Sequence, residues 1–323
     1  MRPLISTVSL YATASIISLS LIVDETLGEP PNRYHPVAWI GKLIGFLDIR
    51  LRKRIDSVSG GAAMAVLAIA VPVALVLIIQ RISSVSIVIE VVVTALILKM
   101  TFASRSMGSH IIPVLRSMKE GDIEGARSLL SRTVRRDTSK LSPGLIYSAC
   151  IETISEGYVD GFLSPVFYYG VFGLSGAVAA RVINTLDSMV GYRDETYMRF
   201  GKFSALADTV MNYIPARISA LVFSISSRSM GRRNLFQKVL MESSKTQSRN
   251  AGWPMASMAF LLGVRLEKEG SYVLNADGRE PSAVDVIRAL RIFQISVLIG
   301  AAMGFMLSVI IVQLILGYAG ILP

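Results

Sequence analysis

The stretch Ala62–Ile79, AAMAVLAIAVPVALVLII, decides the fold because it runs for 18 residues without a charge. A helix of about 20 apolar residues crosses the ~30 Å hydrocarbon core of a bilayer, since each residue adds about 1.5 Å. Similar runs occur at Leu4–Val23 and Ile292–Leu316, and a fourth, Ile82–Ala103, contains Glu90. The sequence therefore predicts an all-α, multi-pass helical integral membrane protein.

The composition agrees with this fold class. Of the 323 residues, 52% are hydrophobic and only 17% are charged, against about 25% charged in an ordinary soluble domain. Two more segments, 162–180 and 205–225, are apolar but contain helix-breaking or polar residues such as Pro165, Gly173 and Pro215. These segments predict broken helices, either spanning or re-entrant. We expect one integral membrane domain over residues 1–323, with a C-terminal transmembrane helix at about 292–316.

The N-terminal apolar run has two possible interpretations, a secretory signal peptide and a retained transmembrane helix. Met1-Arg2-Pro3 ahead of an apolar run is also how a secretory signal peptide begins. No small-residue cleavage site follows, and the run leads directly into Asp24-Glu25. A retained transmembrane helix is therefore the preferred interpretation.

The formal net charge of +10 is concentrated beside the apolar runs. Basic residues gather at 50–54, 105–140 and 228–238. Basic loops next to transmembrane helices are typical of the cytoplasmic side of a membrane, so this pattern favours cytoplasmic loops over a nucleic-acid surface. We expect a protein of the cell membrane that binds no nucleic acid.

Several kinds of site are excluded by residue counts and missing motifs. The single cysteine, Cys150, excludes an intrachain disulfide and a cysteine-rich zinc site, and His35 and His110 are too few for a histidine-based one. The sequence contains no P-loop, no Gly-x-Ser-x-Gly and no His-Glu-x-x-His.

Two connecting segments have predictable local structure. In DETLGEPPNRYHPVAWIGKLIG, residues 24–45, three prolines and Gly28 demand a fixed irregular loop, and a helix is expected to restart near Pro36. His35 fits best as a hydrogen-bond donor that fixes this loop. Residues 105–140 predict a surface helix, because apolar residues from Ile123 to Leu130 recur near a 3.6-residue period.

Three acids lie four residues apart in CIETISEGYVDG, residues 150–161. On an α-helix Glu152, Glu156 and Asp160 would fall within an arc of about 80°, with about 12 Å of rise between the outer two. All three cannot bind one Mg²⁺, so at most two neighbours share an ion. Each would cost about 2.5 to 3.5 kcal/mol in lipid at mid-bilayer, so the stripe must face a polar cavity, a loop or water. An ordinary solvated helix face remains the alternative.

Two further polar groups combine acids, amides and arginines. They comprise Arg181, Asn184, Asp187 and Arg193, and then Asp208, Asn212 and Arg217. Acids that hold Mg²⁺ beside arginines that hold phosphoryl oxygens suit phosphoryl or acyl-phosphate chemistry. The alternatives are a capping network around Asp187 and Gly191, and a structural hydrogen bond from Asn212 to Asp208.

Four stretches in order, 24–44, 152–169, 181–218 and 248–275, together resemble the adenosylcobinamide-phosphate synthase family (CobD/CbiB) of cobalamin biosynthesis. The resemblance runs from about Asp24 to Asn275. Two departures stand out, since Glu29 occupies a position where the family usually has Asp, and Gly157 one where Asn is frequent. These departures concern two side chains and not the family assignment.

The resemblance implies an ATP-dependent carbon–nitrogen ligase of the cell membrane, with its active site on the cytoplasmic side. Such an enzyme joins a carboxylate of adenosylcobyric acid, a corrinoid, to the amine of aminopropanol phosphate, and it uses Mg²⁺. Further partners would be the lipid bilayer, a second copy of the chain or other membrane proteins of the same pathway.

The resemblance also favours functional roles for the polar residues over purely structural ones. Glu152, Glu156 and Asp160 become organisers of metal and phosphate, with Glu156 and Asp160 as metal ligands and Asp187 and Asp208 as the next catalytic candidates. The expected substrate and phosphate contacts are Arg181, Asn184, Arg193, Asn212, Arg217, His35 and Asn250. Four aromatic residues, for which helix packing is the preferred role, are corrin-contact candidates: Tyr168, Tyr169, Phe172 and Trp253.

Two other classes of function remain open. In a transporter or channel, the broken helices at 162–180 and 205–225 and the buried acids would form an ion path. A membrane-bound sensor or assembly protein would carry no chemistry at all.

Overall fold

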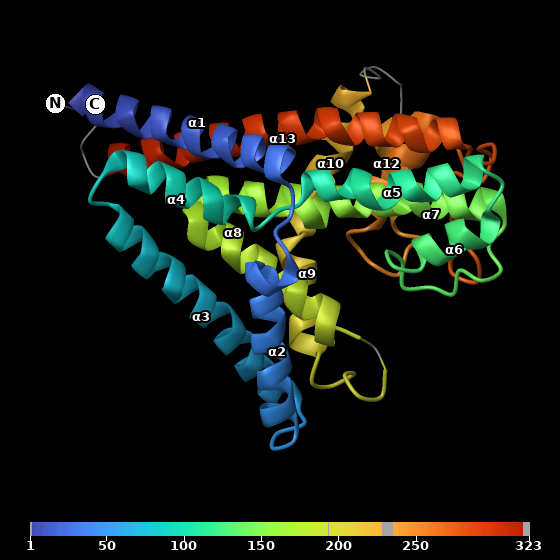
Figure 1. Cartoon of the computed structure of the whole chain (residues 1–323), viewed down its shortest axis with the longest axis horizontal. Helices are drawn as coiled ribbons and strands as arrows, with labels where there is room; N and C mark the ends of the chain where they lie inside the picture. The colour runs from blue at the N-terminus through green and yellow to red at the C-terminus, as the bar shows by residue number, and fades with distance from the viewer. Residues whose placement is uncertain (1, 193, 228–234, 319–323) are drawn as a thin grey trace. The chain divides into compact units, whose positions relative to one another are not determined.

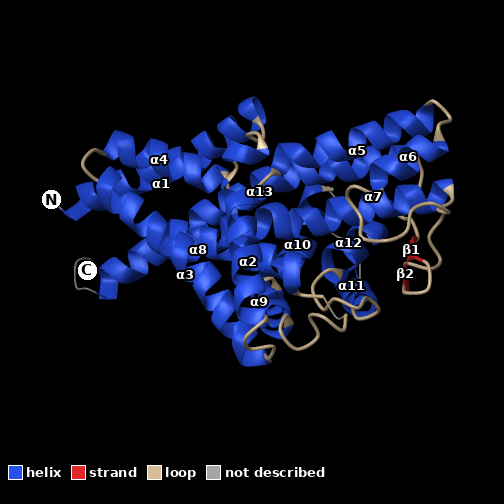
Figure 2. Ribbon diagram, turned by 60° about the horizontal axis from the view of Figure 1, so that its bottom comes forward, coloured by secondary structure: helices blue, strands red, loops and turns tan. Residues whose placement is uncertain are grey.

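The structure is a computed structural model that describes residues 2–192, 194–227 and 235–318. These residues form helices connected by short loops, with a single small hairpin of two three-residue strands among them (Figure 2). They group into two compact units. Unit 1 comprises Met1–Ala103, Ser164–Met211 and Gly300–Pro323, and unit 2 comprises Ser104–Leu163 and Asn212–Ile299. The expected single domain over residues 1–323 stays a prediction.

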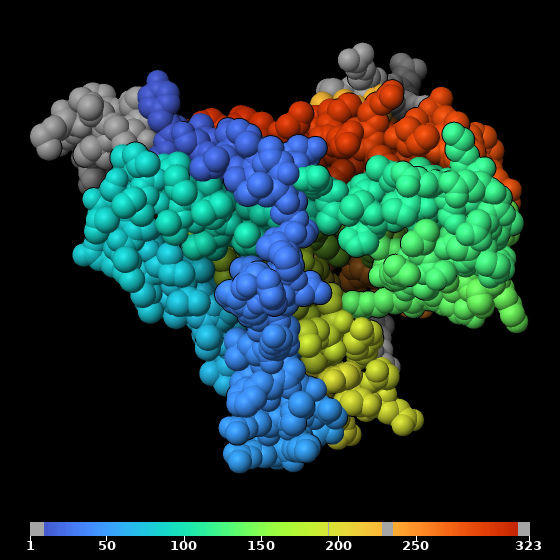
Figure 3. Space-filling view, in the orientation of Figure 1, coloured from blue at the N-terminus to red at the C-terminus, as the bar shows by residue number. Residues whose placement is uncertain are grey.

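Unit 1 is built around helix α8. Its elements are α1 (Arg2–Leu27), the 3₁₀ turn η1 (Asn32–Tyr34), α2 (Pro36–Arg52), α3 (Val58–Ser83), α4 (Ile87–Lys99), α8 (Ser164–Val190), α9 (Lys202–Met211) and the C-terminal part of α13 (Ala283–Tyr318). Helices α2, α3, α4 and α9 all pack on α8 (Figure 1). Helix α1 packs along α4, and the two lie against each other on the face drawn in Figure 3.

Unit 2 is built around helix α7. Its elements are α5 (Ser104–Lys119), α6 (Ile123–Leu130), α7 (Pro143–Tyr158), the π-helix η2 (Val159–Leu163), α10 (Tyr213–Ser226), α11 (Leu235–Ser243), α12 (Gly252–Leu262), β1 (Leu266–Lys268), β2 (Tyr272–Leu274) and the first part of α13. Helices α5, α6 and α12 and strand β1 pack against α7. The strands are antiparallel, with Leu266 opposite Leu274.

Five helical segments of the described chain are long and apolar enough to cross a membrane. They are Leu10–Leu27, Val58–Ser83, Ile87–Lys119, Pro143–Val190 and Ala283–Ile315. The three uncharged apolar runs of the sequence lie within α1, α3 and α13, so these predictions are confirmed. The protein is a multi-pass, all-α membrane protein.

The fourth predicted span, Ile82–Ala103, has a different start. Helix α3 continues to Ser83, a short turn follows, and α4 begins only at Ile87. The backbone N–H of Ser86 bonds to the carbonyl of Ser83, which closes this turn. The apolar pattern does not show the break, because Val85 keeps the run hydrophobic and the two serines beside it are tolerated in a helix.

The predicted broken helices are confirmed. The segment 162–180 begins in the π-helix η2 and then contains Gly173, whose φ of 66° interrupts α8. The segment 205–225 is divided at Asn212, with α9 in unit 1 and α10 in unit 2. Helix α10 has 14 residues, a length of about 21 Å, which is shorter than the hydrocarbon core.

The predicted surface helix at 105–140 is two helices. Helices α5 and α6 are separated at Gly121, which has a φ of 80°. Asp122 then caps α6 by accepting a hydrogen bond from the backbone N–H of Gly125 at 2.8 Å. Ala126 and Leu130 are buried, as their spacing predicts.

Candidate functional site

The first residues of α7 explain where this helix starts. Ser142 is the N-cap, since its side chain accepts a hydrogen bond from the backbone N–H of Leu145, and Pro143 occupies the first turn, where its missing N–H is harmless. The helix then runs without interruption to Tyr158, so Glu152 and Glu156 lie one turn apart on it. This is the local structure that the acid spacing required.

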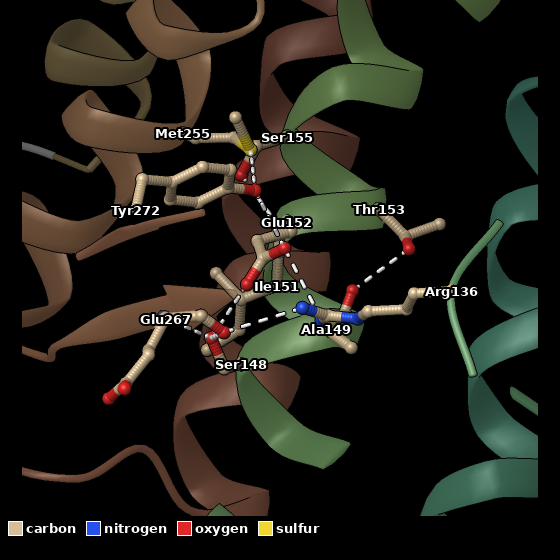
Figure 4. Close-up of polar contacts among 10 residues, drawn as sticks. All are labelled: Arg136, Ser148, Ala149, Ile151, Glu152, Thr153, Ser155, Met255, Glu267 and Tyr272. Atoms are coloured by element: carbon tan, nitrogen blue, oxygen red, sulfur yellow. Dashed lines mark hydrogen bonds and ion pairs between the residues drawn. The ribbon is translucent and has the colours of Figure 1, made fainter. Parts of the chain in front are cut away.

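Glu152 is buried and engages both of its carboxylate oxygens (Figure 4). Its Oε1 accepts a hydrogen bond from the hydroxyl of Ser148 at 2.7 Å, and its Oε2 accepts one from the hydroxyl of Tyr272 at 3.0 Å. Nη2 of Arg136 lies 3.3 Å from the same Oε2. A buried carboxylate needs such partners, because an unpaired charge in a protein interior is strongly unfavourable. Glu152 therefore ties α7 to β2 and to the segment before α7.

The hairpin places Tyr272 against Glu152. The hydroxyl of Ser148 accepts a hydrogen bond from the backbone N–H of Glu267 at 2.8 Å, which anchors β1 to α7, and β2 pairs with β1. Burial and the neighbouring Glu152 carboxylate raise the pKa of Tyr272. Its hydroxyl therefore stays protonated at neutral pH and keeps donating to Glu152.

Glu156 is in a different state from Glu152. Its side chain is exposed, and it has no hydrogen bond or ion pair with any residue that the structure describes. The charged groups that act on it are the carboxylate of Glu152, one turn back on α7, and the basic side chains of Lys268, Arg135 and Arg136. Glu156 is therefore an unengaged carboxylate with cationic groups around it, one turn away from an engaged one.

Asp160 lies beyond the end of α7, within the π-helix η2, and is half-buried. The single stripe of three acids assumed an α-helix through residue 160. Because a π-helix has a wider turn, Asp160 points in a different direction from the one that an α-helical spacing gives. Only Glu152 and Glu156 follow the predicted α-helical relationship. Single π-helical turns inside helices occur frequently at functional sites.

The predicted residues of unit 1 lie on α8 and α9. Arg181, Asn184 and Asp187 are half-buried along α8, and Asp208 is half-buried on α9. Arg193 lies outside the described residues.

Asp187 lies in the last turn of α8, close to Gly191. The backbone N–H of Gly191 bonds to the carbonyl of Asp187 at 2.9 Å. A Cβ at Gly191 would lie 2.2 Å from Oδ1 and 2.7 Å from the carbonyl oxygen of Asp187. The glycine therefore lets the chain pass directly over the aspartate.

His35 fixes the loop between α1 and α2. Its Nδ1 accepts a hydrogen bond from the backbone N–H of Val37 at 3.1 Å and so caps α2. Nδ1 must be unprotonated to accept this bond, so Nε2 carries the proton and donates to Oε2 of Glu29 at 2.6 Å. Both ring nitrogens are thus used within the protein, which is the loop-fixing role that the sequence favoured for His35.

Asn212, Arg217, Asn250 and Trp253 lie in unit 2, whereas Tyr169 and Phe172 lie on α8 in unit 1. Asn212 is buried at the start of α10, and Asn250 is buried just before α12, where its carbonyl accepts a hydrogen bond from the backbone N–H of Trp253 at 3.1 Å. Arg217 is half-buried on α10. Trp253 and Tyr169 are buried, in agreement with a packing role, whereas Phe172 is 66% exposed.

Sequence reasoning missed three members of the Glu152 cluster. In the sequence Arg136 is one basic residue of a basic loop, and the residue types of Ser148 and Tyr272 do not indicate a site. Tyr272 lies 120 positions from Glu152 in the chain. The placement of Tyr272 at the end of a motif that resembles a family motif was the one available hint.

The sequence was compared with known protein families. The model of the CobD/CbiB protein family matches residues 17–298. The chain belongs to the CobD/CbiB family. The matched range contains every predicted site residue, both those of unit 1 and those of unit 2.

Relatives in the CobD/CbiB family are similar over most of their length. A protein of Thermoplasma acidophilum named "Probable cobalamin biosynthesis protein CobD" is 42% identical over 278 residues, which cover 86% of this chain and 91% of the relative. A Pyrococcus abyssi protein with the same name is 38% identical and covers 91% and 96%. The "Cobalamin biosynthesis protein CobD" of Dehalococcoides mccartyi is 38% identical and covers 82% and 87%. No solved structure matches the chain.

The donor set of this CobD/CbiB protein suits one kind of metal site. Among the described residues there is no group of three or more His, Cys, Asp or Glu side chains arranged to hold an ion. Mg²⁺ in phosphate-using sites is held by one or two carboxylates together with water and substrate phosphates, so it does not need a larger cluster. The unengaged carboxylate of Glu156 suits one ligand position of such a site.

Proposed function

We propose that this protein is an adenosylcobinamide-phosphate synthase, an enzyme that joins adenosylcobyric acid to aminopropanol phosphate and consumes ATP. Family membership and relatives named for cobalamin biosynthesis support the pathway. The structural observation that supports this chemistry concerns two acids on α7. Glu152 is bound by three partner side chains, whereas Glu156 is exposed and unengaged. The active site would face the cytoplasm from a cell membrane, because ATP and the basic loops are there.

Amide formation between a carboxylate and an amine requires that the carboxylate first be activated. In the proposed reaction a carboxylate oxygen of the corrinoid attacks the terminal phosphorus of ATP, and ADP leaves. The amine nitrogen then attacks the carbonyl carbon of the acyl phosphate, inorganic phosphate leaves, and the nitrogen loses a proton. Mg²⁺ would neutralise phosphate charge in this site, held by Glu156 and Asp160.

The side chains of the site have distinct tasks in this proposal. Glu156 and Asp160 organise the metal and the phosphates and do not act as bases. Glu152 positions α7 against the hairpin and, through its ion pair with Arg136, holds a cation beside Glu156. Asp187 and Asp208 remain the next catalytic candidates. The candidate substrate and phosphate contacts remain Arg181, Asn184, Arg193, Asn212, Arg217 and Asn250.

The test is an assay of the purified protein in detergent with adenosylcobyric acid, aminopropanol phosphate, ATP and Mg²⁺. Formation of adenosylcobinamide phosphate with release of ADP would support the proposal, and absence of any product would contradict it. Glu156→Gln should lower turnover by about 100-fold or more, which is about 2.7 kcal/mol of transition-state stabilisation, without loss of folding.

The matched control is Glu124→Gln on α6. Glu124 is an exposed acid of the same unit, and within the part of the chain that the structure describes it pairs with Arg127 on its own helix. Its replacement should leave turnover within about threefold. If Glu156→Gln behaves in the same way, α7 presents a solvated face and not a reaction centre.

A further inference from the structure

Arg217, one of the expected phosphate contacts, belongs to a stacked group of side chains in unit 2. The guanidinium carbon of Arg217 lies 3.4 Å from the centre of the Tyr213 ring and 5.0 Å from the centre of the Trp253 ring. Tyr213 and Arg217 are one turn apart on α10, and Trp253 is on α12, which packs against α10. We call these three residues the aromatic platform.

The arginine of the aromatic platform is held flat but has most of its donors unused. A guanidinium has N–H groups around its edge and π-stacks through its faces. Nη1 of Arg217 donates to the carbonyl of Tyr213 at 2.6 Å, and no carboxylate of the described chain pairs with it. Its Nη2 edge is therefore left for an acceptor that comes from outside the described protein. A planar edge of this kind matches two oxygens of one phosphate.

The outer ring of the aromatic platform is open. Tyr213 is 50% exposed although Arg217 covers one of its faces, whereas Trp253 is only 5% exposed. Trp253 thus supports the stack from inside, and the accessible surface of Tyr213 is its other face and edge. An aromatic face that is rigidly supported from behind takes a second flat ring by stacking.

A ligand that uses both the free edge of Arg217 and the open face of Tyr213 must carry an oxyanion and a flat ring. The two groups must be close together in the ligand, because the two side chains are in contact. We propose that the aromatic platform binds a purine nucleotide, with the base on the open face of Tyr213 and a phosphate on the free edge of Arg217. This deepens the proposed function, since it rests on ATP as a substrate and assigns that substrate to α10. Aminopropanol phosphate lacks a ring and would use only Arg217.

The protein contains two tryptophans, so binding can be observed directly. In a Trp39→Phe background the fluorescence of Trp253 reports on the aromatic platform alone. ATP, AMP, tripolyphosphate and aminopropanol phosphate are titrated into the protein in detergent, without corrinoid. We expect a saturable change with ATP and AMP, and binding of ATP that is at least about tenfold tighter than that of tripolyphosphate.

Two substitutions separate the base from the phosphate. Tyr213→Leu should weaken ATP binding by about tenfold or more and leave tripolyphosphate unchanged, whereas Tyr213→Phe should retain ATP binding. Arg217→Gln should weaken both ligands. The matched control is Phe46→Leu, which removes another exposed ring that lies 4.8 Å from an arginine, Arg50 on α2, and should change neither.

The outcomes distinguish this inference from the proposed function. If the protein has synthase activity but ATP binds no better than tripolyphosphate to the unsubstituted platform, or Tyr213→Leu leaves the KM for ATP unchanged, the inference is wrong and the function stands. The stack would then be an anchor at the membrane surface, where Tyr, Trp and Arg also gather. If ATP binding depends on Tyr213 but no amide product forms, the function is wrong and the nucleotide site stands.

Discussion

Nζ of Lys99 lies 2.9 Å from Oε1 of Glu29, and the lysine side chain is completely buried. The same Nζ lies 3.4 Å from Oδ1 of Asp24, which is 1% exposed on the last turn of α1. Lys99 therefore connects the end of α4 to the end of α1 and to the loop that His35 fixes. A buried cation of this kind is strongly coupled to its acids, because removing one partner leaves an uncompensated charge.

We expect Lys99→Met to destabilise the protein by about 3 to 5 kcal/mol. The measurement is the shift of the unfolding midpoint on SDS titration in mixed micelles. Lys245→Met is the control, because Lys245 is 47% exposed and pairs with Glu242 near the surface, so it should cost no more than about 1 kcal/mol. Equal losses in the two variants would show that the buried ion pairs do not hold α1 and α4 together.

Glu29 makes stability depend on acid pH. Burial alone would raise the pKa of Glu29, but hydrogen bonds from His35 and Lys99 outweigh burial and hold it below its ordinary value of 4.5. Because the folded pKa is the lower one, the stabilisation is complete above about pH 4.5 and is lost as pH falls through the folded pKa. Unfolding midpoints between pH 3 and 6 should drop in the parent and drop less in Glu29→Gln. A parallel fall in both proteins would exclude Glu29 as the cause.

The Glu152 cluster should show coupling that Glu156 does not. Tyr272→Phe removes one hydrogen bond to a buried carboxylate and should cost about 1.5 to 3 kcal/mol. In Glu152→Gln the tyrosine bond is already weakened, so adding Tyr272→Phe should cost clearly less, by about 1 kcal/mol. Additive effects would mean that the bond in Figure 4 contributes nothing. With Glu156→Gln in place of Glu152→Gln, the two changes should be additive.

Gly191 should not tolerate a side chain. Since a Cβ there would lie 2.7 Å from the carbonyl oxygen of Asp187, Gly191→Ala should force the end of α8 to shift and cost about 1 to 3 kcal/mol. Gly45→Ala provides the opposite case, because nothing lies within 4 Å of its Cβ position in the interior of α2. This control should be neutral or stabilising by up to about 1 kcal/mol. Destabilisation of similar size in both would point to a general intolerance of alanine.

The membrane helices were predictable because their signal is local. An uncharged run such as Ala62–Ile79 fixes a transmembrane helix without knowledge of any other residue. The same holds for the loop after α1, where prolines and Gly28, with its φ of 66°, exclude a helix until Pro36. The turn between α3 and α4 was not predictable, since Val85 there continues the apolar run and its neighbouring serines are weak helix breakers.

The partners of the site acids were not predictable, because they are distant in the chain. The acid spacing on α7 gave the position of Glu152 and Glu156 correctly, but only the structure separates the locked acid from the unengaged one. Tyr272 reaches Glu152 through a hairpin of two three-residue strands, and strands this short leave little pattern in a sequence. The ion pairs of Lys99 with Asp24 and Glu29 were unpredictable for the same reason, because in the sequence Lys99 is a single charge at the end of an apolar helix.

The division into two units has a consequence for how the protein is made. The chain passes from one unit to the other at residues 103, 163, 211 and 299. Unit 1 is therefore synthesised as three separate segments of the chain. The last of them, from Gly300 onward, is made only after all of unit 2 has been synthesised. The first helices of unit 1, α1 to α4, therefore enter the bilayer before their packing partners α8, α9 and the end of α13 have been synthesised. Neither unit corresponds to a continuous gene segment, so neither can be expressed or exchanged between relatives as a simple fragment.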